Sequence, residues 1–156
     1  MIVFEVIMVF MFWLLTLYSI HRICHNVPFL KKIHWAHHDF IFDQKGNLWN
    51  WKILFLYNDD LPSTIDTWIS EVLPTIFVCW ITGHWWLFVF FYIWAAGIQE
   101  FIEHNPKINL YPFFTSGRWH LLHHKNYRYN FGLFFPIFDI LFGTNKRVVE
   151  NSQLKI

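Results

Sequence analysis

Histidine spacing is the feature that most constrains this chain. Eight of its ten histidines fall into three short clusters, and two of these clusters share the pattern H-x-x-H-H. On an α-helix, side chains three or four residues apart lie on one face, so each cluster can direct several imidazoles toward one point. The clustered residues are His21, His25, His34, His37, His38, His120, His123 and His124.

These clusters predict a site for two metal ions. The last two side chains of H-x-x-H-H diverge by about 100° around a helix, so one cluster can serve two adjacent ions. Structural zinc is one alternative, but zinc prefers closed sites of four ligands, and eight imidazoles exceed that number. Exposed, unligated histidines are the other alternative. Three clusters that each have ligand spacing argue against it. Imidazole binds Fe, Zn and Cu alike, so the ligand type leaves the metal open.

The composition favours a lipid environment. Hydrophobic residues make up 55% of the 156 residues and charged residues 15%, against about 25% charged in ordinary globular proteins. Nineteen Phe and ten Trp are too many for the core of so small a domain, which buries about 70% of its unfolded surface. We assign residues 1–145 to a single membrane domain and residues 146–156 to a polar C-terminal tail. A net charge of +1 gives no basic field for nucleic acid, so no nucleic-acid partner is expected.

Apolar runs predict helices that cross the membrane. Residues 2–20 carry one charge, Glu5, and approach the ~20 residues needed to span a bilayer core. A buried helix in a soluble core is the alternative for this run. Residues 67–103 predict a helical hairpin with a short first arm at 67–82, a tip at Thr82-Gly83-His84 and a return arm at 85–103. The fold class is therefore all-α: an integral membrane helical domain with a His-rich helical cap that holds a two-metal site.

Shorter signals divide the rest of the chain. Pro28 predicts a helix end after His25, because the residue before proline avoids the α region. A turn is expected at residues 45–47 and an interfacial helix at residues 48–57. Ser63 with Asp66 resembles a capping box at the start of the next helix.

The basic residues orient the domain. All twelve Lys and Arg lie within residues 22–52 and 107–155, and the positive-inside rule places both regions in the cytoplasm. The histidine clusters are then expected on the cytoplasmic side of a multi-pass membrane protein. Residues 2–20 lack a basic n-region and a small-residue cleavage site, so no cleavable signal peptide is expected.

Two histidines lie outside the clusters. His104 follows the return arm of the hairpin and is expected on the side of the clusters as a further ligand. His84 lies at the tip, about 30 Å away for twenty helical residues, and is excluded from the site. Glu100 lies one turn before His104 and is expected to accept a hydrogen bond from a ligand imidazole. Glu103 is a weaker candidate for that role.

Five segments in order resemble one family. His21-Arg22-Ile23-Cys24-His25 matches an H-R-x-x-H box, and two H-x-x-H-H boxes, Asn130-Phe131-Gly132 and Asp139–Thr144 follow it. In this order and spacing, residues 10–144 resemble the fatty acid hydroxylase/sterol desaturase superfamily of integral-membrane di-iron enzymes. Two features depart from the family pattern. Phe138 stands where Trp is usual, and no histidine occurs near residues 60–72, where the family often has a His-Pro pair with an acidic residue.

The resemblance implies a function and a set of ligands. It implies O2-dependent hydroxylation or desaturation of a C–H bond in a lipid such as a fatty acyl chain or a sterol, in lipid biosynthesis. The implied cofactor is two non-haem Fe ions, and the implied partners are the bilayer, the lipid and an electron donor such as a small cytochrome or ferredoxin with its reductase. Asn130 and Asp139, with Glu100, are expected to support the ligands by hydrogen bonding. The implied ligands are His21, His25, His34, His37, His38, His104, His120, His123 and His124.

Two other functions stay open at this point. The first is a catalytically inactive or truncated metal-binding membrane relative. The second is a membrane zinc hydrolase, although the sequence contains no H-E-x-x-H pattern. The sequence does not distinguish hydroxylation from desaturation, and it names neither the lipid nor the electron donor.

Overall fold

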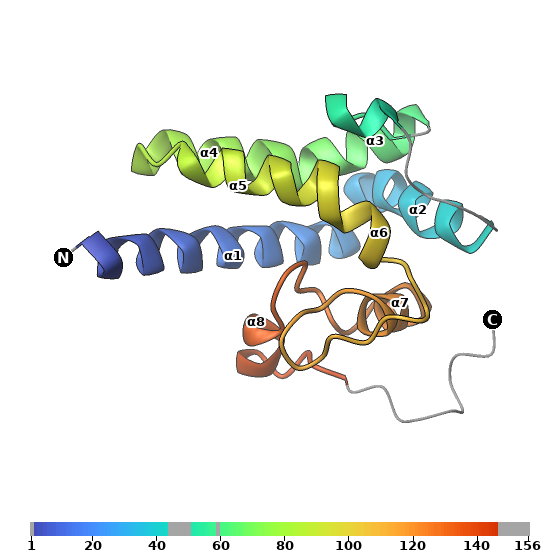
Figure 1. Ribbon diagram of the computed structural model, residues 1–156. Helices are drawn as coiled ribbons and strands as arrows, with labels where there is room; N and C mark the ends of the chain where they lie inside the picture. Colours follow the sequence, from blue (N-terminus) through green and yellow to red (C-terminus); the bar gives the residue numbers. More distant parts are fainter. Residues whose placement is uncertain (1, 44–50, 59, 147–156) are drawn as a thin grey trace.

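The structure, a computed structural model, describes residues 2–43, 51–58 and 60–146; the side chains of residues 39–43 and of Glu100 lie outside the description. These residues are mostly helical, and among them no β-strand forms; a single bridge pairs Asn109 with Gly117. The all-α prediction is thus confirmed. Figure 1 shows α1 running alongside the hairpin of α4 and α5, with α7 and α8 on the other side of α1.

The first helix is longer than its apolar run. α1 spans Ile2–Asn26 and carries His21 and His25 in its last turns, while α2 spans Pro28–Asp43. The predicted break at Pro28 is confirmed. The backbone N–H of Lys31 still donates to the carbonyl of Val27 at 2.8 Å, so α2 starts immediately after the break. The first two histidine clusters therefore lie on two consecutive helices.

The predicted hairpin is confirmed, but its first arm is not short. This arm begins at Leu61 rather than at residue 67, and Leu61–Thr82 is long enough to cross a membrane. Gly83 ends it in the left-handed conformation, with φ 74° and its N–H donating to the Cys79 carbonyl at 2.8 Å. The first arm comprises α3 (Leu61–Thr67), η2 (Trp68–Val72) and α4 (Leu73–Thr82); the return arm comprises α5 (Trp86–Ile93), η3 (Trp94–Gln99) and α6 (Glu100–Ile102).

The core is an aromatic cluster around Trp13. The indole N–H of this fully buried residue donates to Thr75 Oγ1 on α4 at 2.8 Å. Its ring lies 4.7 Å from that of Phe134 and 6.5 Å from that of Phe91, between centroids. Aromatic pairs at such separations stabilise a core beyond the area that they bury. Trp13 thus connects α1 to both hairpin arms and to the C-terminal segment.

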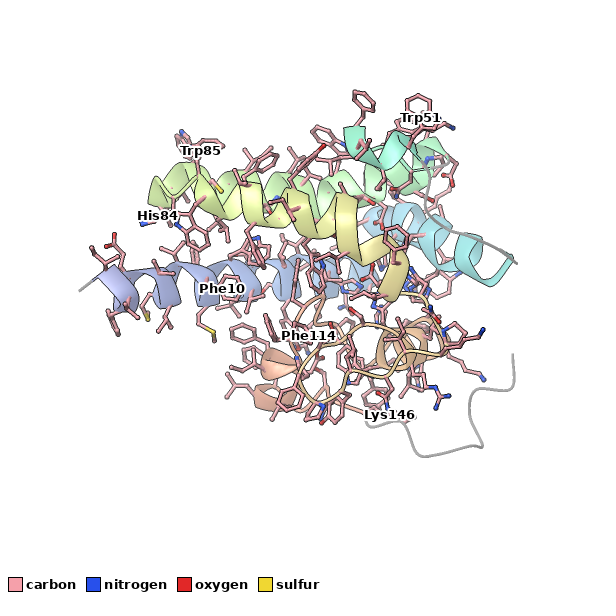
Figure 2. All side chains as sticks on the ribbon, viewed as in Figure 1. Phe10, Trp51, His84, Trp85, Phe114 and Lys146 are labelled. Carbon is pink, nitrogen blue, oxygen red and sulfur yellow. The ribbon has the colours of Figure 1, made fainter. Side chains whose placement is uncertain are left out.

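The outer faces of these helices are apolar and exposed. Only 28% of the most apolar window of α1 is buried, whereas the core helix of a soluble protein is mostly buried. Phe4, Phe77 and Trp80 are each at least half exposed, and Figure 2 shows side chains projecting from the long helices on their outer sides. Exposed apolar faces of this extent indicate a membrane environment.

Two predictions about short elements are wrong. The described part of residues 48–57 forms only a 3₁₀ turn, η1 (Trp51–Phe55), not a longer interfacial helix; the turn predicted at residues 45–47 lies outside the described residues. The N-cap of α3 is Asp60, whose carboxylate accepts from the Ser63 N–H at 2.8 Å. Asp66 therefore takes no part in a capping box.

The C-terminal region forms a cap with little regular structure. It contains α7 (Arg118–Lys125) and α8 (Ile137–Leu141), joined by a loop. Most of the tail predicted from residue 146 lies outside the described residues. α7 carries the third histidine cluster and lies beside the ends of α1 and α2 in Figure 1.

Candidate metal centre

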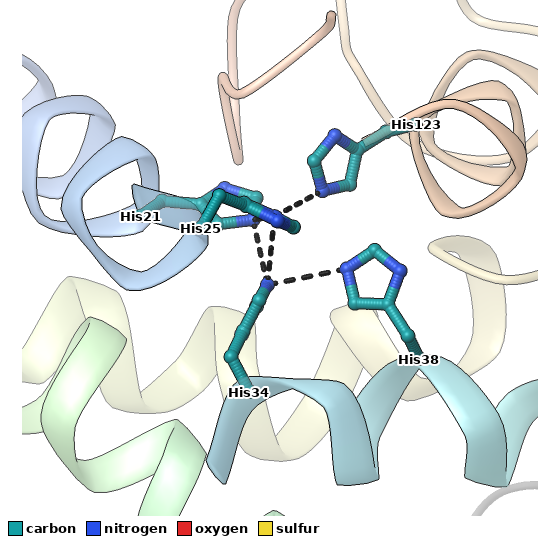
Figure 3. A group of neighbouring side chains, drawn as sticks. All are labelled: His21, His25, His34, His38 and His123. Carbon is teal, nitrogen blue, oxygen red and sulfur yellow. Dashed lines mark hydrogen bonds between the residues drawn. The ribbon is translucent and has the colours of Figure 1, made fainter. Parts of the chain in front are cut away.

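Nine histidines gather into two groups at this end of the molecule. Within each group, one ring nitrogen per histidine lies within 4.8 Å of all the others. The five-histidine group, shown in Figure 3, consists of His21, His25, His34, His38 and His123; the four-histidine group consists of His37, His104, His120 and His124.

Helical geometry divides each H-x-x-H-H box between the two groups. In the box on α2, His34 and His38 join the five-histidine group, whereas His37 joins the four-histidine group. The box on α7 does the reverse, since His123 alone joins the five-histidine group. Residues four apart share a helical face and adjacent residues diverge. This is the division that the sequence spacing predicted for two adjacent ions.

Hydrogen bonds fix the tautomers of three rings in the five-histidine group. Nδ1–H of His21 donates to the Phe131 carbonyl at 2.7 Å, and Nδ1–H of His123 donates to the Tyr129 carbonyl at 2.7 Å. Nδ1–H of His34 donates to Asp66 at 2.8 Å. A neutral imidazole with Nδ1 protonated presents a lone pair at Nε2. These three rings therefore direct acceptor atoms into the group.

The converging lone pairs fit a bound cation. The Nε2 atoms of His21 and His34 are 3.2 Å apart, and neither carries a proton to share. The Nε2 atom of His25 lies 3.0 Å from the Nε2 atoms of both His34 and His123. It can donate a proton to only one of them. Such lone pairs repel one another unless a positive ion lies between them. The four-histidine group has the same close spacing, with His124 Nε2 at 3.0 Å from His120 and 3.2 Å from His104.

Burial keeps these imidazoles neutral. Desolvation lowers the pKa of His37 to about 4, and it lowers the pKa of His120 and His124 well below the usual range. Neighbouring histidines add to the effect for all three. Only a neutral ring has a nitrogen free to bind a metal, so the site holds its histidines in the ligating form at neutral pH.

Asp66 is a site residue that the sequence reading assigned wrongly. It is buried in α3, and both carboxylate oxygens lie within 2.9 Å of His34 Nδ1. A carboxylate behind a metal-binding histidine orients the ring and raises its basicity. One sequence feature could have identified Asp66: the resembled family often has an acidic residue in the region that corresponds to residues 60–72.

Asn130 and Asp139 hold the loop that orients the ligands. The Asp139 carboxylate accepts from the N–H groups of Phe131 and Gly132 at 2.8 and 2.7 Å, and from the Thr144 hydroxyl at 2.7 Å. Asn130 exchanges hydrogen bonds with the backbone of Lys146. Asp139 thus fixes the backbone on both sides of the Phe131 carbonyl, and Asn130 ties the start of this loop to Lys146; in these contacts neither side chain bonds an imidazole.

The remaining predicted residues differ in whether they lie near the two histidine groups. His104 joins the four-histidine group. His84 lies at the hairpin tip, where its Nε2 is 3.4 Å from Glu5, at the far end of the molecule in Figure 2. The side chain of Glu100 lies outside the described part of the chain. Glu103, the weaker candidate, is buried with its Oε1 3.7 Å from His120 Nε2.

Comparisons with known proteins agree with the histidine pattern. A sequence profile of the family described as "Fatty acid hydroxylase" matches residues 6–144. Delta(7)-sterol 5(6)-desaturase ERG3A of Gibberella zeae is 28% identical over 130 residues, 82% of this chain and 34% of that protein. Lathosterol oxidase of Homo sapiens is 27% identical over 134 residues, 83% of this chain and 41% of that protein. The chain thus spans well under half the length of these relatives, and no solved structure shows a significant match.

Proposed function

Because the chain belongs to the fatty acid hydroxylase family, we propose that it is an O2-dependent lipid oxidoreductase with two non-haem iron ions. The observation that carries this proposal is the division of nine imidazoles into two adjacent groups. A structural zinc site needs four ligands, and a zinc hydrolase needs a general base beside metal-bound water, for which the sequence has no H-E-x-x-H pattern. Two neighbouring centres with nitrogen ligands suit oxygen chemistry, in which two metals act together.

A lipid is the substrate class that fits the surroundings of the site. Relatives such as the desaturase of Gibberella zeae carry names that refer to sterols, and we extend that class to this chain. Both apolar arms of the hairpin and α1 have one end close to the histidine groups, so a substrate dissolved in the bilayer would lie near the site. The reaction is hydroxylation or desaturation of a C–H bond of a sterol or acyl chain.

The protein's part in the reaction is to hold and orient ligands. The five-histidine group would hold one ion and the four-histidine group the other. When bound, the irons supply the O2 activation that side chains cannot perform. Asp66 and the carbonyls of Tyr129 and Phe131 keep three Nε2 atoms deprotonated and aimed at the ion. Burial of these rings limits access of bulk water.

The charge distribution supports a topology and a partner. All Lys and Arg lie outside residues 53–106, so we place the histidine groups on the cytoplasmic side of a multi-pass protein. Either reaction consumes O2 together with two electrons and two protons. The electrons come from a small redox protein, such as a cytochrome or a ferredoxin with its reductase.

Metal analysis of the detergent-purified chain tests the proposal. We expect about two irons per chain, and oxidation of a sterol or acyl lipid under isotopically heavy O2 with a reductant. Label in the product identifies hydroxylation, and loss of two hydrogens without label identifies desaturation. Stoichiometric zinc with no iron-supported oxidation would contradict the proposal. Retained metal without O2 consumption would instead identify an inactive metal-binding relative.

A further inference from the structure

A buried carboxylate lies against the four-histidine group. Glu103 is 5% exposed, and its Oε1 is 3.7 Å from His120 Nε2, one of the atoms that face the centre of that group. Its other oxygen, Oε2, accepts a hydrogen bond from Gln99 Nε2 at 2.6 Å. The carboxylate is therefore anchored on one side while the other side faces the imidazoles.

Two π-helical segments bring this anchor into place. Gln99 ends η3 on the return arm, and Glu71 lies in η2 on the first arm. The amide of Gln99 bridges the arms, since its Nε2 also lies 3.3 Å from Glu71 Oε1. π-helical turns are rare and occur frequently at functional sites. Here one such turn on each arm directs a polar side chain into the space beside the histidines.

Two buried carboxylates lie near the histidine groups, one on each arm of the hairpin. Glu71 and Glu103 are both buried, and neither hairpin arm carries Lys or Arg, because none occurs in residues 53–106. Burying a carboxylate is costly unless positive charge compensates it. Both carboxylates line the cavity that the two histidine groups also line. A metal ion in the four-histidine group would place positive charge in that cavity, beside the Glu103 carboxylate.

The distances fit direct ligation. Two ligands of one ion, each bonded at about 2.1 Å, lie roughly 3 to 4 Å apart. The imidazole pairs of this group are separated by 3.0 and 3.2 Å, and the carboxylate oxygen by 3.7 Å from His120. We propose that Glu103 is an oxygen ligand of the ion at the four-histidine group, held in position by Gln99. The inference rests on the proposed function, because it requires that the histidine groups bind metal.

Anaerobic titration of the metal-free full chain with Co²⁺ tests this ligand without measuring turnover. Wild-type protein should bind two ions. Glu103→Gln should bind one ion as wild type does and the other on the order of tenfold or more weakly. Glu71→Gln is the matched control, since it removes the same charge one hydrogen bond further from the imidazoles. Because Glu71 lines the same cavity but is not proposed as a ligand, its loss should weaken the binding of one ion by no more than about threefold, well short of the loss in Glu103→Gln.

The outcomes separate the two proposals. Wild-type affinity for both ions in Glu103→Gln would overturn the ligand, and so would equal losses in the two variants, which would indicate a charge effect. Wild-type protein that binds no metal at all would contradict the metal centre itself. If Glu103→Gln fails to fold, infrared spectra of wild-type protein with ¹³C-labelled glutamate decide. We expect Co²⁺ to shift a labelled carboxylate band in wild type and in Glu71→Gln, and absence of that shift would overturn the proposal.

Discussion

The position of one proton decides whether each imidazole can bind a metal. In His34, Asp66 holds the proton on Nδ1 and leaves Nε2 as an acceptor. In His21 and His123, a backbone carbonyl does the same. Of these three acceptors only Asp66 is charged, so it alone also raises the basicity of its ring.

Replacing this carboxylate tests its contribution. Asp66→Asn keeps an oxygen that can accept from His34 Nδ1 but removes the charge, so we expect metal affinity to fall by about tenfold. Metal titration of the purified variant measures the change. Asp60→Asn is the control, because Asp60 caps the same helix through Ser63 without contacting a histidine. Equal metal affinities in the two variants would argue against a role for Asp66.

A pair of alanine variants distinguishes a histidine of the proposed site from a histidine outside it. His123→Ala removes one of the three oriented lone pairs of the five-histidine group, so we expect metal content and activity to be lost while membrane insertion persists. His84→Ala removes a ring at the opposite end of the molecule and should leave metal content unchanged. Metal analysis of membrane-extracted protein checks both. Full turnover in His123→Ala would remove this residue from the site.

Among the elements, α7 depends on a tight junction at its start. Gly117 precedes the helix with φ 75°, and its N–H donates to the Glu103 carbonyl at 2.8 Å. A Cβ at this position would lie 2.2 Å from the Ile108 carbonyl oxygen. The end of the return arm is therefore hydrogen-bonded to the start of the helix that carries the third histidine cluster, across the loop that separates them in sequence.

A glycine substitution tests this junction. Gly117→Ala combines a left-handed backbone with a clash against main chain, so we expect a loss of about 2–4 kcal/mol in the free energy of unfolding. Gly97→Ala is the control. Its added Cβ meets nothing within 4 Å, and alanine in a helix should leave stability unchanged or raise it by about 0.5–1 kcal/mol. Thermal unfolding in detergent compares them, and equal melting temperatures would refute the packing argument.

Sequence periodicity identified the elements and the histidines that gather into two groups, but not the contacts between elements. The spacing of His34, His37 and His38 predicted how they divide, because that division depends only on helical geometry. The role of Asp66 depends on how α3 packs on α2, so a local reading mistook it for a cap. The π-helical turns were missed because a search for a repeat of 3.6 residues does not reveal them. The start of the first hairpin arm was misjudged, because the helix begins at Leu61, before its apolar run.

At the scale of the whole molecule, so many buried neutral imidazoles make the metal-free protein sensitive to acid. Desolvation lowers the pKa of His34 and His37 to about 4, against about 6.5 for unfolded histidine. Between these values the unfolded chain binds more protons than the folded one, so stability must fall as the pH decreases from 6.5 to 4. Melting temperatures of the metal-free protein at pH 7 and pH 5 measure this. A temperature that is unchanged or higher at pH 5 would contradict it.

The hydrogen bond between His21 and the Phe131 carbonyl joins residues 110 positions apart in the sequence. At 5–20 residues per second, the ribosome needs roughly 5–20 s to make the second after the first. Tyr18, one turn before His21, likewise bonds the hydroxyl of Thr144 at 2.9 Å. His21 is thus oriented only after the chain has been synthesised as far as Phe131. The five-histidine group, which also contains His123, can therefore assemble with His21 in its final orientation only after this length of chain exists.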